Sequence, residues 1–362
     1  MKRIGYIYQQ IISIENLLLA DMRARKGKLK TYGVKVHDKN REENILKLHQ
    51  LLKNKTFKTS DYETFIIHEP KERVIFRLPY FPDRIVHHAI MNVLEPIWVS
   101  VFTVDSFSCI KGRGISGAMR KVKKAIKDPE NARYCLKIDI KKFYPSIDHD
   151  VLKSVLRKKL KCKDTLALLD SIIDSADGVP IGNYLSQYFA NLLLTYFDHW
   201  IKEVKRIKYY FRYADDMVFL SSSKEELHDL LQEIKNYIKE NLSLELKSNY
   251  QVFPLTKDHK MKGGRGLDFV GFVFYFNEMR MRKRIKQNLC RVISRINKKK
   301  FTMELSEEKK LNAVPFTAKH AKKELAPWLG WAKNSDSDYL LKKLLKKEYY
   351  EICILSRRAS KA

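Results

Sequence analysis

Three aspartates are the residues of this 362-residue sequence whose types and positions could do chemistry. Asp215 and Asp216 stand side by side in FRYADDMVFL, at the predicted turn between two apolar strands, and Asp139 lies on the exposed face of the alternating strand YCLKIDI. Like charges between buried strands are unfavourable unless cations compensate them. Because neighbouring strands lie about 4.8 Å apart, we expect Asp139 and Asp215 to share cations, with Asp216 outside them.

This arrangement predicts phosphoryl transfer assisted by two metal ions. Such a reaction uses ions about 3.5 to 4 Å apart, one to activate an attacking hydroxyl and one to carry a triphosphate. Mg²⁺ is the expected ion, because it prefers oxygen ligands and keeps waters that phosphate oxygens can displace. The predicted metal ligands are Asp139, Ile140, Asp215 and Asp216. The alternative is structural, since aspartate is also a common turn former.

The first half of the chain predicts helices and strands that lead up to Asp139. Apolar residues at helical spacing indicate helices over 6–24 and about 40–53, separated by a basic break. Segment 61–81 indicates two short strands with a basic turn, and DRIVHHAIMNVLEPIW a helix that ends at Pro96. Strand 134–140 should expose Cys135, Lys137 and Asp139, and a helix over 148–160 should begin at a cap formed by Ser146 or Asp148.

The second half predicts the hairpin that carries Asp215 and Asp216, followed by a basic helical end. NYLSQYFANLLLTYFDHWI is apolar on nearly every side and indicates one buried helix before the hairpin. After it we expect a helix over 224–240, a strand in LELKSNYQVFPL and a further hairpin in GLDFVGFVFYF with MRMRKR. From about 283 onward the pattern is helical.

The charge balance points to a polyanionic partner. The chain has 71 Lys and Arg against 42 Asp and Glu, a net charge of +29. Residues 257–362 alone carry 27 Lys and Arg against 11 Asp and Glu, a net of +16. Such a surface attracts nucleic acid. A ribosome-associated or merely soluble basic protein is the alternative that composition leaves open.

The cysteines and the apolar segments bear on location. Five cysteines are scattered without a CxxC pair, which predicts neither a zinc ribbon nor a disulfide framework and fits a reducing cytosol. The first 28 residues lack the features of a cleaved leader, and no segment approaches about 18 uninterrupted apolar residues. We therefore expect a soluble, cytoplasmic protein with no membrane contact.

The motifs resemble those of reverse transcriptases. YADD at 213–216 resembles their YxDD box, and KIDIKKFYPSIDH at 137–149 their first palm motif. Further segments resemble other motifs of the family and occur in the family's order: EPKERVIFRLPYFPDRIVHHAI, SFSCIKGRGI, PIGNYLSQYFANLLL and GLDFVGFVF. The resemblance implies an RNA-directed DNA polymerase with an α+β right-hand fold. Its expected parts are an N-terminal helical extension (1–60), fingers (61–133), an antiparallel-sheet palm with inserted fingers helices (134–278) and a basic helical thumb (279–362).

The segment around Ile181 narrows the resemblance. Group II intron enzymes carry PQG followed by SP at this place, whereas this chain has IGN followed by SQ. This form resembles the reverse transcriptases of diversity-generating retroelements. The segment PWLGWAKNSDSDYLLKKLL also resembles the end of their thumb. This subtype implies errors at adenines. Alternatives are a free-standing reverse transcriptase of a phage-defence or retron-like system, although the VTG-type retron signature is missing, and a non-catalytic basic RNA-binding or scaffold protein with the same fold.

The resemblance also implies roles for individual residues. Asp139, Asp215 and Asp216 would be the catalytic metal ligands for two Mg²⁺ ions, and Tyr144 would lie under the sugar of the incoming nucleotide and disfavour a 2′ hydroxyl. The alternative for Tyr144 is a core aromatic. The other implied contacts are with the deoxynucleoside triphosphate, from Lys71, Arg73, Ile181, Gly182 and Gln187, and with the template and primer, from Lys111, Arg113 and Lys247.

Four more of these residues have specific alternatives. Lys71 and Arg73 could be solvated surface charges, and Lys247 could instead align with the family lysine that protonates pyrophosphate. Ile181 stands where a glutamine would offer hydrogen bonds near the nascent base pair. Without these hydrogen bonds, the shape of the base pair would be the remaining check on fidelity. The alternative is that Ile181 only packs the turn. The implied partners are a template RNA, the cDNA primer duplex, deoxynucleoside triphosphates and a small basic accessory protein that forms a ring.

Overall fold

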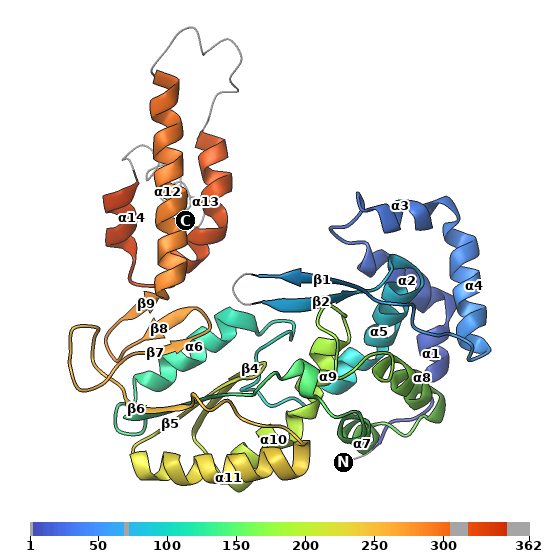
Figure 1. The fold of residues 1–362 in the computed structure, drawn as a ribbon, viewed down its shortest axis with the longest axis horizontal. Coiled ribbons are helices and arrows are strands. Elements are labelled where there is room, and N and C mark those ends of the chain that lie inside the picture. Colours follow the sequence, from blue (N-terminus) through green and yellow to red (C-terminus); the bar gives the residue numbers. More distant parts are fainter. Residues whose placement is uncertain (1–2, 69–71, 305–317, 346–362) are drawn as a thin grey trace, which may run out of the picture. The chain divides into compact units, whose positions relative to one another are not determined.

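The computed structural model describes residues 3–68, 72–304 and 318–345. They form helices and antiparallel sheets, which confirms the α+β prediction. The chain divides into two compact units (Figure 1). The first comprises residues 1–118, 136–220 and 225–252, and the second residues 119–135, 221–224 and 253–362.

The first unit opens with four helices rather than the two that the sequence predicts. They are α1 (Tyr8–Ile12), α2 (Ile14–Ala24), α3 (Tyr32–Lys39) and α4 (Arg41–Lys53). Ser13 interrupts the predicted helix over 6–24, because its extended backbone lets its side chain cap α2 at the Asn16 N–H. The predicted basic break is present as turns over residues 25–31, but the sequence missed α3, which follows it and is anchored by buried Val34 and His37.

A β-hairpin and a long helix follow. Strands β1 (Glu63–Ile67) and β2 (Arg73–Arg77) pair antiparallel, as predicted. After the π-helical turn η1 (Tyr80–Arg84), helix α5 (Ile85–Val99) packs against α2 (Figure 1). The prediction that Pro96 ends α5 was wrong. Proline removes only its own N–H, and its carbonyl still accepts a hydrogen bond from the Ser100 N–H at 3.2 Å.

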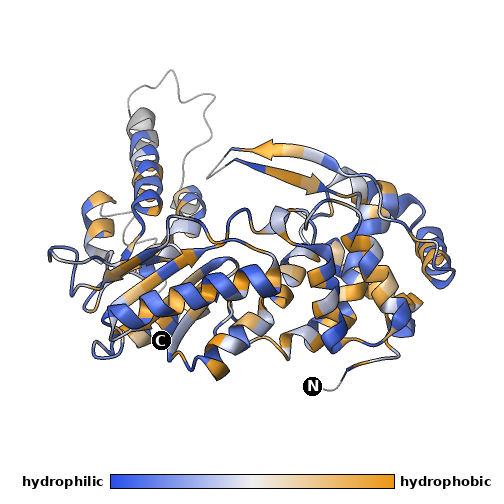
Figure 2. Cartoon of the chain, turned by 60° about the horizontal axis from the view of Figure 1, so that its bottom comes forward, coloured by the Kyte–Doolittle hydropathy of each residue, from blue (hydrophilic) through white to orange (hydrophobic). Residues whose placement is uncertain are grey.

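A four-stranded sheet with the order β4-β5-β3-β6 carries the predicted aspartates. Its strands are β3 (Tyr134–Asp139), β4 (Tyr209–Tyr213), β5 (Asp216–Ser221) and β6 (Gln251–Pro254), so the last strand is shorter than predicted. The predicted exposed face of β3 was wrong for Cys135, which is buried. Helix α11 (Lys224–Leu242) runs along this sheet (Figure 1) and buries apolar residues such as Leu231 and Ile238, while hydrophilic residues alternate with them (Figure 2).

Shorter helices complete the first unit. Asp148 caps α7 (His149–Lys159) by accepting from the Val151 N–H, which decides between the two predicted caps. Helix α8 (Lys163–Ile173) was missed. The prediction of one continuous helix over 183–201 was wrong. The segment forms three successive helices: α9 (Ser186–Leu193), α10 (Thr195–His199) and the π-helical η3 (Trp200–Val204). Helix α9 is buried on every side as expected, apart from Gln187. The 3₁₀ turn η2 (Tyr144–Ser146) also belongs to the first unit, whereas α6 (Gly114–Ile126) begins in the first unit and continues into the second from residue 119.

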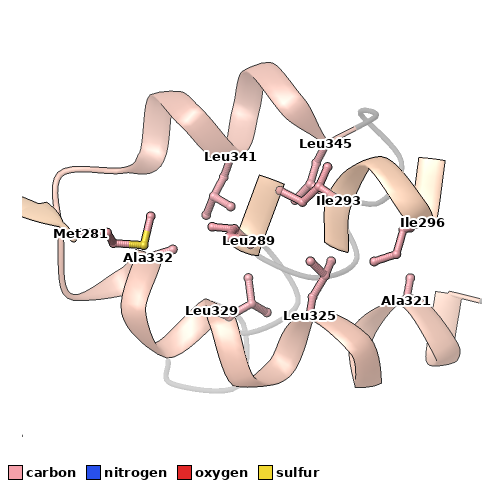
Figure 3. Close-up of a cluster of buried hydrophobic side chains, with 10 residues drawn as sticks. All are labelled: Met281, Leu289, Ile293, Ile296, Ala321, Leu325, Leu329, Ala332, Leu341 and Leu345. Carbon is pink, nitrogen blue, oxygen red and sulfur yellow. The ribbon is translucent and has the colours of Figure 1, made fainter. Parts of the chain in front are cut away.

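The second unit contains a small sheet and the basic helices. Strands β7 (Leu267–Phe269), β8 (Phe272–Phe274) and β9 (Met279–Met281) form a three-stranded antiparallel sheet. Helices α12 (Lys283–Glu304), α13 (Ala318–Lys333) and α14 (Asp338–Leu344) follow and pack together. Their shared core is apolar and includes Leu289, Ile293, Leu325 and Leu341 (Figure 3). Residues 346–362, which end the predicted thumb, lie outside the described residues.

Among the helices that the structure describes, none combines the length and the apolar character needed to cross a lipid bilayer.

Candidate active site at the Asp215 turn

A two-residue turn presents Asp215 at the tip of the β4-β5 hairpin. Tyr213 pairs with Asp216, which leaves Ala214 and Asp215 as the turn residues. Ala214 takes a left-handed backbone with φ +55°, a conformation that two-residue hairpin turns need at their first position. The strands on both sides are buried, including Phe211 and Val218. The apolar flanks seen in the sequence therefore hold this turn in place.

Two lysines contact the aspartates directly. The Nζ of Lys247 lies 2.5 Å from Oδ1 of Asp139, and the Lys247 N–H donates to the Asp139 carbonyl at 2.9 Å. The Nζ of Lys137 lies 3.3 Å from Oδ2 of Asp216. Sequence reasoning assigned no role to Lys137. The signal was present, because residues two apart on a strand share a face, and Lys137 stands two residues before Asp139.

Burial makes the ionised forms of Asp215 and Asp216 unfavourable despite the nearby lysines. Burial, followed by the nearby Asp139 carboxylate, raises the pKa of Asp215 to about 6. Burial likewise raises the pKa of Asp216 to about 6, against the opposing effect of Lys137. The Oδ1 atom of Asp216 is buried and has no hydrogen-bond partner within the described part of the chain. Each observation indicates carboxylates that would gain from a cation.

The donor set fits a hard divalent cation such as Mg²⁺, because it consists of carboxylate oxygens. Among the described residues, no group of three His, Cys, Asp or Glu side chains is assembled as a metal centre. In this structure the ammonium groups of Lys137 and Lys247 compensate part of the negative charge of Asp216 and Asp139. Asp139, Asp215 and Asp216 are the side chains that would hold a metal ion. The Ile140 side chain is buried and offers no donor atom, so only its backbone could contribute.

Tyr144 connects the aspartates to the β1-β2 hairpin. Burial raises the pKa of Tyr144 above its usual range, Asp215 raises it further, and Arg73 lowers it. Both charged groups therefore lie within electrostatic reach of the Tyr144 ring. The Tyr144 carbonyl also accepts the Val179 N–H at 2.9 Å, which brings the following turn toward the same place.

The turn that contains Ile181 is fixed to β2. The Phe76 N–H donates to the Ile181 carbonyl at 2.8 Å. Gly182 has φ +120°, and a Cβ at this position would lie 2.4 Å from the Phe76 carbonyl oxygen. Asn183 donates to the Tyr62 hydroxyl at 2.9 Å. This turn therefore sits on the strand that carries Arg73, and glycine is required for its close approach.

The other predicted contact residues are less closely tied to the aspartates. Lys111 and Gln187 are exposed. The Arg113 guanidinium donates to the carbonyls of Thr103 at 2.5 Å and Ser106 at 3.1 Å, so it is engaged in holding a loop. Lys71 lies outside the described residues.

Comparison with known proteins shows the family to which the chain belongs. The family described as "Reverse transcriptase (RNA-dependent DNA polymerase)" matches residues 66–261. Protein YkfC of Escherichia coli (strain K12) is 23% identical over 268 residues, which cover 62% of this chain and 67% of that protein. The group II intron-encoded protein LtrA of Lactococcus lactis is 25% identical over 211 residues, which cover 55% of this chain and 33% of that protein.

Among solved structures, apo telomerase from Candida tropicalis is similar at a TM-score of 0.49 and 13% identity, over 82% of this chain and 63% of that one. This chain thus spans about two thirds or less of the length of these relatives. The family match covers more than half of the chain and includes Asp139, Asp215 and Asp216. The chain belongs to the reverse transcriptase family of RNA-dependent DNA polymerases.

Proposed function

We propose that the chain is an RNA-directed DNA polymerase that copies a template RNA into cDNA by two-metal nucleotidyl transfer. The observation that carries this proposal is the meeting of Asp139 from β3 with the Asp215 turn, where burial and mutual repulsion raise the carboxylate pKa values. Bound Mg²⁺ ions would activate the primer hydroxyl and stabilise charge on the phosphates. The three aspartates would hold these ions.

The residues around the carboxylates would bind and orient the substrates. Tyr144, which lies within electrostatic reach of Arg73 and Asp215, would pack against the sugar and exclude a 2′ hydroxyl. Arg73, and Lys71 two residues before it in sequence, would neutralise the triphosphate. Lys247 would move from Asp139 toward phosphate when a metal ion takes its place. Its ammonium group could then donate a proton to the leaving pyrophosphate.

The proposal keeps the parts expected from the resemblance: an extension over 1–60, fingers over 61–133, a palm over 134–278 and a thumb over 279–362. In addition to template RNA, primer duplex and deoxynucleoside triphosphates, it includes a small basic accessory protein ring as a partner and a cytoplasmic location. The exposed lysines and arginines of α12 support contact with nucleic acid phosphates.

Primer extension on an RNA template tests the activity. We expect Mg²⁺-dependent extension by the unaltered chain and a loss of roughly 10³-fold or more in Asp215→Asn, because the metal ions would lose a shared ligand. Asp229→Asn, which removes an exposed carboxylate on α11, is the matched control and should extend normally. Extension that survives Asp215→Asn, or no extension by any variant, would leave the non-catalytic RNA-binding alternative as the better proposal.

Within the family, we propose the diversity-generating retroelement type over a free-standing phage-defence or retron-like enzyme. The support is the Ile181 turn, whose side chain offers no hydrogen bond where group II intron enzymes carry glutamine. Ile181→Gln should therefore change misincorporation, especially opposite template adenines, as measured by sequencing cDNA made on an adenine-rich RNA. An error spectrum equal to that of the unaltered chain would contradict the shape-only role of Ile181. A neighbouring repeat pair that differs only at adenines would support the subtype independently.

A further inference from the structure

A charged side chain is buried directly behind the catalytic turn. Arg212 lies on β4, two residues before Ala214, and is 1% exposed. Asp198 on α10 is fully buried and faces it. Their contact has two arms, from Arg212 Nε to Asp198 Oδ1 at 2.7 Å and from Nη2 to Oδ2 at 2.5 Å. The sequence shows the signal, an arginine inside an apolar strand, but we assigned it no role.

The ion pair is the centre of a saturated hydrogen-bond network. The Tyr210 hydroxyl donates to Asp198 Oδ1 at 2.6 Å, and the Ser106 hydroxyl donates to Oδ2 at 2.6 Å. Ser106 also accepts from Arg212 Nη2 at 3.0 Å. The two-armed contact with Asp198 fixes the plane of the guanidinium.

One arm of the guanidinium reaches the catalytic turn itself. Nη1 of Arg212 donates to the Ala214 carbonyl at 3.1 Å and to Oδ1 of Asn191 at 3.1 Å. The Ala214 carbonyl belongs to the peptide unit that leads into Asp215. A turn whose first residue holds a left-handed backbone is best kept in one conformation when its carbonyl has a fixed partner.

A purely stabilising role explains this arrangement less well. Two buried charges are costly to bring out of water, and apolar residues of similar size often stabilise as much. Lysine could also neutralise Asp198, but only the planar fork of arginine can grip both carboxylate oxygens and still point a further N–H at the turn. The geometry therefore favours positioning over stability alone.

We propose that Arg212, held by Asp198, is a positioning residue that sets the peptide carrying Asp215 and so the orientation of both aspartates of the turn. Its catalytic consequence rests on the proposed polymerase function. The effect on the turn does not, because it concerns the conformation of the protein alone.

Arg212→Lys is the direct test, since it keeps the charge and removes the fork. We expect kcat for primer extension to fall roughly 10- to 100-fold, as misplaced catalytic groups do, while KM for deoxynucleotide and the affinity for template-primer change less than about threefold. Hydrogen exchange of the peptide over 213–217 should quicken, and Mn²⁺ binding followed by electron paramagnetic resonance should weaken.

Tyr210→Phe is the matched control. It removes one hydrogen bond from the same Asp198 oxygen but leaves the Arg212 contact with Ala214 in place. It should lower the melting temperature while keeping kcat and the exchange at 213–217 near those of the unaltered chain. If both variants lose kcat and exchange protection in parallel with stability, or if Arg212→Lys keeps both, the positioning role is wrong.

Asn191→Ala covers the case in which Arg212→Lys does not fold. It frees Nη1 on one side and keeps the Asp198 fork, so a smaller loss of kcat with faster exchange at 213–217 would support the proposal, and no change in either would overturn it. If the unaltered chain extends no primer, the polymerase function fails, and hydrogen exchange alone still decides the role of Arg212.

Discussion

At the scale of single residues, the site is organised by a competition between ammonium groups and the cations that the aspartates would bind. Lys247 forms an ion pair with Asp139, and Lys137 forms one with Asp216. A lysine can stand in for a cation because it carries positive charge on a flexible stem, yet it can withdraw when a metal ion arrives. The two lysines therefore offset part of the negative charge of the aspartates.

The residue that reports this competition most directly is Asp216, whose pKa is raised from 3.8 to about 6. A carboxyl group with a raised pKa in the folded state stabilises the fold at pH below 3.8 and loses that contribution as pH rises through 6. In metal-free buffer we expect Asp216→Asn to be more stable than the unaltered chain at pH 7 to 8, by about 2 kcal/mol. Urea unfolding in chelator across pH 4 to 8 measures the difference.

The advantage of Asp216→Asn should shrink to near zero as pH falls to 4, and Mg²⁺ should stabilise this variant less than it stabilises the unaltered chain. Asp229→Asn on α11 is the control: it should show no such pH-dependent advantage and should gain as much stability from Mg²⁺ as the unaltered chain. A difference that stays constant with pH would mean that the Asp216 carboxyl is already ionised at low cost, against the burial argument.

The sequence identified the carboxylates but not their neighbours, for a physical reason. Asp139, Asp215 and Asp216 can be recognised in the sequence because they are charged residues next to or within apolar strands, and this pattern is local in the chain. Lys247 meets Asp139 across 108 positions. Lys137 and Arg212 were visible as charges, but their partners depend on which strands and helices become neighbours, and that is set by the whole fold.

At the scale of elements, helix and strand types were predicted better than their breaks. The β1-β2 and β4-β5 hairpins and the helices α7 and α11 formed where periodicity placed them. The breaks at Ser13 and within 183–204 follow from capping and from packing against neighbours, which periodicity does not contain. Helix α3 was missed because its apolar positions, such as Val34, are few in a basic segment and become buried only by tertiary contact.

The turn over 180–183 is the element whose close contact with β2 gives the sharpest test. A Cβ on Gly182 would overlap the Phe76 carbonyl at 2.4 Å, and alanine resists φ +120°. Gly182→Ala should therefore reduce the free energy of unfolding by about 2 to 4 kcal/mol. Because the Ile181 carbonyl would leave the Phe76 N–H, the variant should also lose primer extension even at temperatures where it stays folded.

Gly112→Ala provides the matched control for backbone strain. Gly112 has φ +81° with no atom within 4 Å of a new Cβ, so its replacement costs only the left-handed backbone, about 1 kcal/mol. Thermal and urea unfolding of both variants measure the difference. Equal losses would show that the contact between Gly182 and Phe76 yields easily and does not hold the turn.

At the scale of the whole molecule, the two units divide chemistry and charge. The described carboxylate site lies entirely in the first unit, whereas residues 257–362 hold a net charge of +16 out of +29. The second unit can carry this charge because α12, α13 and α14 bury a separate apolar core (Figure 3). Exposed basic residues of α12 such as Lys286 and Arg295 are not part of that core.

This division predicts how salt should weaken binding to a template-primer duplex. Each phosphate contact that is lost changes the slope of log affinity against log salt concentration by about 0.9. Lys286 and Arg295 are exposed on α12. The double variant Lys286→Gln with Arg295→Gln should make the slope of log affinity against log salt concentration shallower by about 2. Fluorescence anisotropy with a labelled RNA–DNA duplex between 50 and 200 mM salt, conditions of the order used for such slopes, measures it.

The control for this prediction removes the same amount of charge from the exposed side of α11, as Lys224→Gln with Lys239→Gln. If net charge alone attracted the duplex, both double variants would change affinity alike through the long-range field. If α12 contacts phosphates, only its own variant changes the slope, and it does so equally for unrelated duplex sequences, because phosphate contacts carry no sequence information. Equal slopes for the two variants would therefore remove α12 from the nucleic acid interface and leave its charge as a general attraction.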